Sequence, residues 1–125
     1  MADFSSQLRL QPSVTAPALA REALRQMATQ HVGPDVLDTA ELLTSELVTN
    51  AVRHGRGVVT LAIQLAGPSL AVAVGDDDPA APKVVPEQLL SLGGRGMRMV
   101  EALAGAWGVT PHNGRPGKDV WFRLP

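Results

Sequence analysis

One long amphipathic segment constrains the fold of this chain more than any other feature. From Pro34 to about His54, apolar residues recur at three- and four-residue steps, the period of a helix buried along one side. Gly33 precedes this segment, proline is well tolerated in a first helical turn, and Gly55 and Gly57 stop the pattern. The sequence therefore predicts a long helix whose apolar positions are Val36, Ala40, Leu43, Leu47 and Ala51.

Such a helix must bury its apolar side against another layer, and two alternating segments supply one. Residues 58–65 and 70–75 alternate in hydropathy, and the turn residues Gly67 and Pro68 separate them. The period of two and the short connection predict an antiparallel hairpin. Its apolar faces consist of Val59, Leu61, Ile63 and Leu65 in the first strand and Leu70, Val72 and Val74 in the second.

The rest of the chain predicts a first edge strand at 6–10, a helix at 16–30, one helical turn at 87–90, a helix at 97–103, and final strands at 107–110 and 120–124. We expect an α+β fold, a two-layer α/β sandwich with about five strands. Its mixed, mostly antiparallel sheet is covered on one face by three helices. The core positions expected in the two shorter helices are Leu19, Ala23, Leu24 and Met27, and Met97, Val100, Leu103 and Ala104.

Length and composition exclude several classes of protein. A chain of 125 residues predicts a single domain spanning 1–125. Eleven basic residues against twelve acidic ones remove the usual electrostatic footprint of a nucleic-acid binder, so we expect no direct nucleic-acid partner. The chain has no cysteine, no apolar segment typical of a secretory signal and no run long enough to cross a membrane. These observations predict a cytoplasmic protein without a membrane partner.

A carboxylate and an amide share one face of the long helix. Glu46 and Asn50 are four residues apart, and a rotation of about 100° per residue puts Asn50 beside the apolar stripe. A polar amide at such a place needs a hydrogen-bond partner or an opening to a cavity. The plain alternative is an Asn at the edge of an amphipathic helix with an exposed Glu.

A second carboxylate stands at the end of the hairpin. Asp76 has the parity of the apolar residues before it, so its side chain is expected to point toward the helix layer. A carboxylate there needs a donor, and the exocyclic amine of a purine is one candidate. The alternative is that Asp76, Asp77 and Asp78, followed by Pro79, only form a turn.

A glycine turn opens the third helix. Closely spaced glycines at a helix start let backbone N–H groups approach an anion, and the helix dipole adds to the attraction. Here the turn is Gly93-Gly94-Arg95-Gly96 before Met97, and it matches neither a Walker A nor a Rossmann sequence. The alternative is a loop that only caps a helix.

Taken in order, these three features resemble the GHKL ATPase superfamily, the Bergerat fold. SELVTNAVRHG at 45–55 is similar to its N-box, and VGDDDPAAP at 74–82 looks like a variant of its D-x-G-x-G box. GGRGMRMVEALAGAWGV at 93–109 looks like its second glycine box, and GKDVWFRLP at 117–125 resembles its closing strand. The short length and the N-box wording look like the stand-alone anti-sigma factor serine/threonine kinases of actinobacteria.

The resemblance implies a role for each matching residue. Asn50 would hold Mg²⁺ on the phosphates, and Glu46 would act as the general base. Asp76 would accept a hydrogen bond from the adenine amine. The ATP phosphates would be wrapped by the glycine turn and approached from the end of the long helix, a set of positions comprising Gly94, Arg95, Gly96, Met97, Arg53 and His54.

The resemblance implies two candidate functions. Departures from the family pattern affect the choice between them. The first is an Mg-ATP-dependent kinase that phosphorylates an anti-sigma factor antagonist and otherwise binds a sigma factor. Because kinases of this type are often dimers, the resemblance also implies a homodimer. The second is a non-catalytic or degenerate nucleotide-binding module that regulates by sequestering a protein partner. The later glycines of the first box are Asp78 and Ala80 here, Leu92 stands where kinases of this type can carry an arginine, and Lys118 follows Gly117 where the family usually offers Thr.

Overall fold

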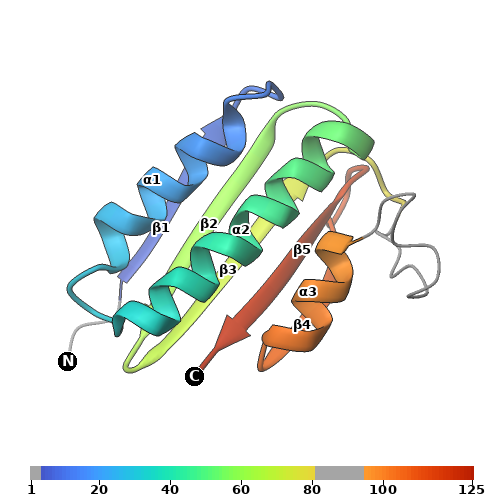
Figure 1. The fold of residues 1–125 in the computed structure, drawn as a ribbon. Helices are drawn as coiled ribbons and strands as arrows, with labels where there is room; N and C mark the ends of the chain where they lie inside the picture. Colours follow the sequence, from blue (N-terminus) through green and yellow to red (C-terminus); the bar gives the residue numbers. More distant parts are fainter. Residues whose placement is uncertain (1–3, 81–94) are drawn as a thin grey trace.

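The computed structural model describes residues 4–80 and 95–125 (Figure 1). In that part of the chain it has five strands and three helices. They are β1 (Phe4–Leu10), α1 (Ala16–Ala28), α2 (Pro34–His54), β2 (Val59–Ala66), β3 (Ser69–Asp76), α3 (Arg95–Leu103), β4 (Ala106–Pro111) and β5 (Lys118–Leu124). The predicted helical turn at 87–90 lies outside the described residues.

The five strands form one sheet in the order β1-β2-β3-β5-β4. All four neighbouring pairs are antiparallel, so the mixed component expected from the sequence is absent from the described sheet. Two hairpins explain this arrangement. β2 and β3 are joined by a tight turn, and β4 turns back into β5, which then lies between β4 and β3.

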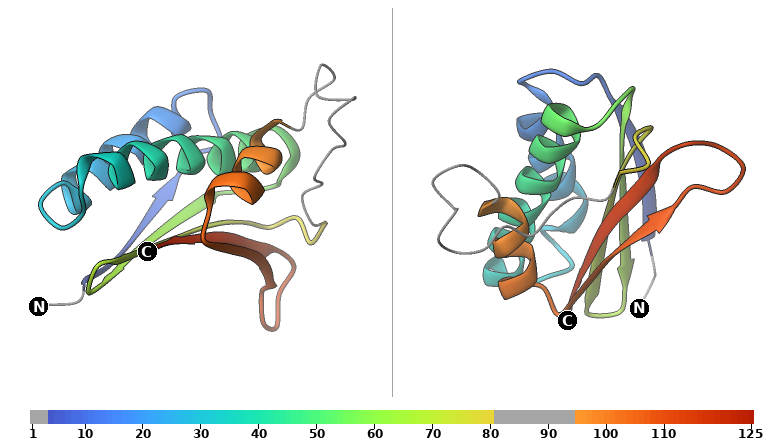
Figure 2. Two further views of the ribbon diagram at one scale, coloured as in Figure 1. Left: turned by 60° about the horizontal axis from the view of Figure 1, so that its bottom comes forward. Right: turned by 90° about the vertical axis from the view of Figure 1, so that its right-hand side faces the viewer.

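The helices cover one face of the sheet and leave the other uncovered (Figure 2). Between the layers lies an aliphatic core around the fully buried Phe122, to which every helix and strand in the described part of the chain contributes. The strands alternate as the sequence predicted, with Val59, Leu61, Ile63 and Leu65 buried in β2. The predicted α+β sandwich is therefore confirmed.

The long helix is the central element of the helical layer. α2 begins at Pro34 and ends at His54, as the periodicity and the flanking glycines predict. It lies between α1 and α3 (Figure 1) and packs along both of them and over β3. No helix among residues 4–80 and 95–125 is both long and apolar enough to span a membrane.

Two apolar residues expected in the core are exposed instead. Leu19 in α1 is 53% exposed and Leu103 in α3 is 49% exposed. In α1 the buried side is a row of residues four apart, which lets the helix approach the sheet through small side chains. Periodicity found the helix but misjudged the rotation of its buried face, which consists of Ala16, Ala20, Leu24 and Ala28.

One polar atom in the core of α2 has no partner among the described residues. Thr44 is fully buried, and its hydroxyl Oγ1 makes no hydrogen bond within that part of the structure. A buried hydroxyl without a partner costs roughly 1–3 kcal/mol. The unpaired hydroxyl of Thr44 therefore lowers the stability of the core.

We predict that Thr44→Val raises the free energy of unfolding by about 1 kcal/mol, because it removes the unpaired hydroxyl and keeps the branched shape. Urea denaturation followed by circular dichroism measures the change. Thr39→Val on the same helix, at a half-buried position, is the matched control and should change stability less. A destabilised Thr44→Val protein would mean that the hydroxyl has a partner in solution.

Candidate functional site

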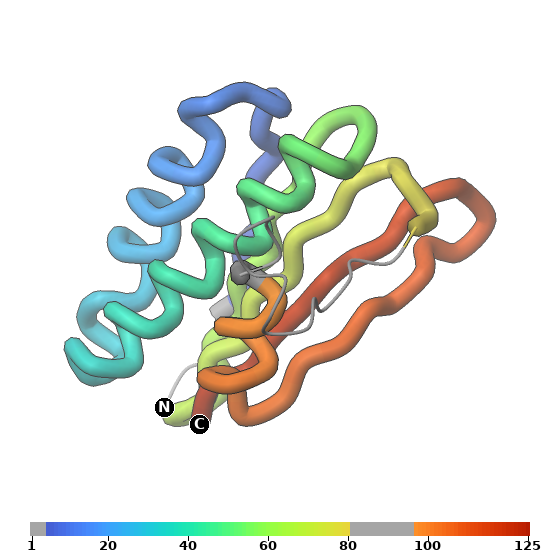
Figure 3. The backbone as a smooth tube through the Cα atoms, turned by 45° about the vertical axis from the view of Figure 1, so that its right-hand side comes forward, coloured from blue at the N-terminus to red at the C-terminus, as the bar shows by residue number. Residues whose placement is uncertain are grey.

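Chain segments that are distant in sequence meet at one end of the molecule. The last turn of α2 lies against the end of β3, which also contacts the start of β5 (Figure 1). Helix α3 packs against α2 instead. The turned view in Figure 3 shows the end of β3 beside the start of β5, with α3 apart from both. The topology thus brings the helix that carries Glu46 and Asn50 against the strand end that carries Asp76, whereas the glycine turn lies partly outside the described residues.

Contacts to α1 establish which way α2 is rotated. Arg21 of α1 donates a 2.6 Å hydrogen bond to the hydroxyl of Ser45, and Arg25 of α1 forms a 2.5 Å ion pair with Glu41. The Glu41 carboxylate also raises the pKa of the Arg25 guanidinium, chiefly through this hydrogen bond. Ser45 and Glu41 therefore mark the side of α2 that faces α1.

Glu46 and Asn50 lie on the opposite edge of α2. A helix advances by about 100° per residue, so these two positions fall on the side away from Ser45, toward α3. Both residues are half-buried, and no hydrogen bond joins either side chain to another described residue. Arg53 and His54, one turn later, are exposed. Within the described part of the chain, the edge of α2 that faces α3 thus offers a carboxylate and an amide without hydrogen-bond partners.

Gly55 brings this helix against the end of β3. Its N–H donates to the carbonyl of Ala51 at 3.0 Å and closes the last turn of α2. A Cβ at position 55 would lie 2.5 Å from that carbonyl oxygen, 2.6 Å from Asp76 Cγ and 2.7 Å from Asp76 Oδ2. Only a glycine leaves room for this approach. Asn50 lies about 7.5 Å before Gly55 along the helix axis.

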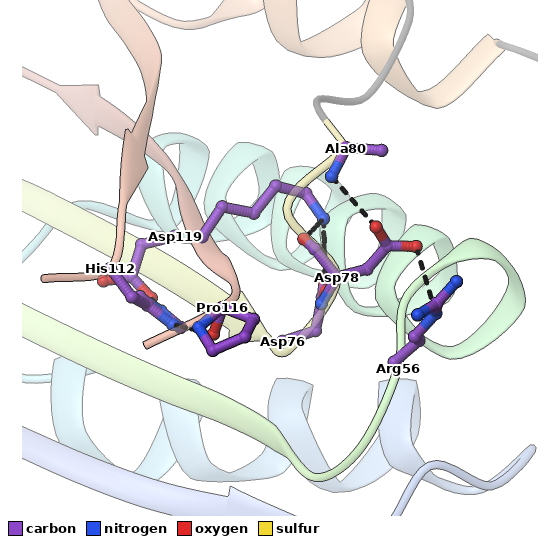
Figure 4. Close-up of polar contacts among 8 residues, drawn as sticks. Arg56, Asp76, Asp78, Ala80, His112, Pro116 and Asp119 are labelled. Atoms are coloured by element: carbon purple, nitrogen blue, oxygen red, sulfur yellow. Dashed lines mark hydrogen bonds and ion pairs between the residues drawn. The ribbon is translucent and has the colours of Figure 1, made fainter. Parts of the chain in front are cut away.

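Asp76 is buried in an ion pair. It is 4% exposed, and both of its carboxylate oxygens accept hydrogen bonds from Lys118 Nζ at 3.1 Å. The Asp78 N–H donates to Asp76 Oδ1 at 2.7 Å, and Lys118 Nζ also donates to the Asp78 carbonyl at 2.8 Å. Figure 4 shows this cluster at the end of the sheet. The side chain of Asp76 points inward, as its parity predicted.

The residues after Asp76 form a turn with its own hydrogen bonds. Asp78 Oδ1 accepts from the N–H of Ala80 at 2.9 Å, and Asp78 Oδ2 lies 3.9 Å from Arg56 Nε (Figure 4). The N–H of Asp77 donates to the carbonyl of Arg56 at 2.8 Å. The turn expected from the Asp-rich sequence is therefore real, and it is tied to the segment that follows α2.

The turn between β4 and β5 presents Lys118. His112 Nε2 donates to Asp119 Oδ1 at 3.0 Å across this turn. Gly117 has a φ of 120°, and a Cβ there would collide with the backbone oxygen of Asp76 and the ring of His112. The start of β5 is thus pressed against the end of β3, which puts the lysine side chain beside Asp76.

The structure describes only part of the predicted glycine turn. Gly94 lies outside the described residues, and Arg95 and Gly96 belong to the first turn of α3. Met97 is buried in the core, so its side chain packs between the layers. Lys118 is the site residue that sequence reasoning missed. Its position after Gly117 was visible, but its partner lies 42 residues away.

Comparison with known proteins identifies the class to which this fold belongs. Residues 10–124 match the family model of histidine kinase-like ATPase domains. The chain belongs to this family, which is the one that the N-box and glycine boxes resemble. ATP is the ligand that membership implies. No curated protein matches the chain significantly.

A solved structure has the same fold. The chain is similar to the crystal structure of the RsbU and RsbW domains of Rv1364c from Mycobacterium tuberculosis, with a TM-score of 0.70 and 21% sequence identity. The match covers 96% of this chain and 32% of that one. This chain therefore spans about a third of the length of the chain in that structure.

We predict that Gly55→Ala lowers the free energy of unfolding by about 1–3 kcal/mol, because the new methyl group overlaps the Asp76 carboxylate and a helix carbonyl. Chemical denaturation measures the loss. Gly33→Ala is the matched control, since a Cβ there meets nothing within 4 Å. Equal effects of the two substitutions would show that Gly55 does not press against Asp76.

Proposed function

We propose that this chain is an Mg-ATP-dependent serine/threonine kinase of the anti-sigma factor type. It phosphorylates an anti-sigma factor antagonist and, when not so engaged, holds a sigma factor. The observation that supports the proposal is the close approach of Gly55, at the end of the helix that carries Glu46 and Asn50, to Asp76 at the end of β3.

The donor set at this end of the molecule fits a magnesium nucleotide. The Asn50 amide is half-buried and without a partner among the described residues, and an amide oxygen is a hard ligand suited to Mg²⁺. Asp76 Oδ2 keeps acceptor capacity beyond its bond to Lys118.

Each residue then has one task. Asn50 would hold the Mg²⁺ of the nucleotide, and Asp76 would accept a hydrogen bond from the adenine amine. Glu46, one turn before Asn50, takes the proton from the attacking serine hydroxyl. Arg53 and His54 are exposed at the end of α2, where they can reach phosphates, and the segment from Gly94 to Gly96 supplies backbone N–H groups to them. The bound Mg-ATP supplies the phosphoryl group, and catalysis is mostly positioning and electrostatics.

Partner control follows from the same chemistry. Phosphorylation of a serine adds close to two negative charges to an interface, and this disrupts a contact that was formed with the neutral side chain. The likeness to a protein with RsbU and RsbW domains supports partners of the anti-sigma system. A kinase of this kind changes which of two partner proteins it holds.

One specific observation favours a second function, a nucleotide-binding module without phosphotransfer. Asp78 brings a further carboxylate to the turn where the family pattern has glycine. Its Oδ2 lies 3.9 Å from Arg56 Nε, a long ion pair that neutralises the charge weakly. That charge opposes a triphosphate nearby. In this alternative the chain regulates by sequestering its protein partner.

Two substitutions four residues apart on one helix separate these functions. We predict that Asn50→Ala weakens Mg-ATP binding at least tenfold, because a metal ligand is lost. Glu46→Gln should leave binding within about twofold and lower phosphotransfer by two to four orders of magnitude, because only the proton acceptor is lost. Calorimetry measures the first effect, and radiolabel transfer from ATP to a candidate antagonist protein measures the second.

The outcomes distinguish the proposals. Asn113→Ala, in the exposed turn between β4 and β5, is the control and should change neither quantity. ATP binding without transfer in the wild-type protein would favour the sequestering module. No saturable binding of Mg-ATP would refute both nucleotide-dependent functions.

A further inference from the structure

The carboxylate assigned to the adenine amine is already engaged by a lysine. Lys118 Nζ lies 3.1 Å from Asp76 Oδ1 and 3.1 Å from Oδ2, so the ammonium straddles the carboxylate. The side chains are only 7% and 4% exposed. Water does not screen a pair at this depth. The ammonium group can leave the carboxylate only if water or another partner replaces that contact.

Counting donors shows that the lysine is saturated. An ammonium group has three N–H donors, and Lys118 directs them to the two oxygens of Asp76 and to the carbonyl of Asp78. None is left for a ligand. Lys118 is therefore not arranged to bind a phosphate or a base while this cluster is intact.

Counting acceptors shows where a base could still bind. Asp76 Oδ1 accepts from Lys118 and from the N–H of Asp78, whereas Oδ2 accepts only from Lys118 among the described residues. A carboxylate oxygen has two lone-pair sites. One site therefore remains on Oδ2, the oxygen that lies against Gly55.

We propose that Lys118 neutralises the carboxylate that recognises the nucleotide base and thereby lowers the affinity of the site for adenine. This inference rests on the proposed function, in which Asp76 recognises the adenine amine. With the lysine in place, the base meets a carboxylate whose charge is already neutralised. Without the lysine, the adenine amine would donate to a buried Asp76 carboxylate that has lost the ammonium group paired with it.

The physical basis is the strength of a charge-assisted hydrogen bond. Such bonds are roughly twice as strong as those between neutral groups, and a buried carboxylate without its counter-charge gains most from a new donor. Lys118 removes both advantages in the nucleotide-free protein. The ion pair with Asp76 thus stabilises the nucleotide-free protein and lowers its affinity for the nucleotide.

The first test uses the wild-type protein. Lys118 is one of two lysines in the sequence, so selective isotope labelling of lysine gives two side-chain NMR signals. Lys83→Arg assigns them. We expect the Lys118 side-chain signal to shift with Mg-ATP and Mg-ADP and to stay in place with inorganic tripolyphosphate, because the base and not the phosphate reaches Asp76.

The second test removes the ammonium and keeps the length of the side chain. Lys118→Met should lower the melting temperature without nucleotide. The affinities for ATP and ADP should both rise by the same factor, about tenfold. The affinity for GTP should not rise, because a free carboxylate repels the guanine carbonyl. Arg123→Met, on the exposed side of the same strand, is the matched control and should leave all three affinities unchanged.

Several results would overturn the inference. Saturable ATP binding with no shift at Lys118 would do so, as would a shift produced by tripolyphosphate alone. ATP affinity that is unchanged or weaker in a folded Lys118→Met protein would show that the lysine supports the site. If that variant does not fold, the wild-type NMR result decides. Absence of ATP binding in the wild type would instead refute the proposed function on which the inference rests.

Discussion

The buried ion pair between Asp76 and Lys118 is the interaction on which this end of the molecule depends. It joins the end of β3 to the start of β5, and Gly55 brings the end of α2 against the same carboxylate. Removing one partner of such a pair typically costs about 3–5 kcal/mol, because the remaining charge is buried alone. The pair holds together the segments that the proposed nucleotide site requires.

Much of this fold could be predicted from the sequence, because its strongest signals are local. The period of α2 and its flanking glycines gave its limits, and the alternation of β2 and β3 gave their hairpin and the inward direction of Asp76. The exposed Leu19 and Leu103 were missed, since a short helix with apolar residues on several sides does not reveal which side meets the sheet.

The chemistry of the site was harder to predict, because it depends on contacts between distant residues. Glu46 and Asn50 are neighbours on one helix, so their spacing alone placed them together. The pairing of Asp76 with Lys118 spans 42 residues and follows from the position of β5 between β3 and β4. Family membership accounts for the nucleotide, whereas this contact is a property of the chain itself.

The most direct test of the central claim is to map Mg-ATP binding on the backbone amide signals of the ¹⁵N-labelled protein. We expect saturable shifts at Asn50, Gly55, Asp76 to Asp78 and Gly117, because α2, β3 and β5 come together there. The uncovered face of the sheet should stay unchanged, including the cavity of about 140 Å³ lined by residues such as Ala62, Ala73 and Arg115. Shifts confined to that face, or no saturable shifts at all, would contradict the account.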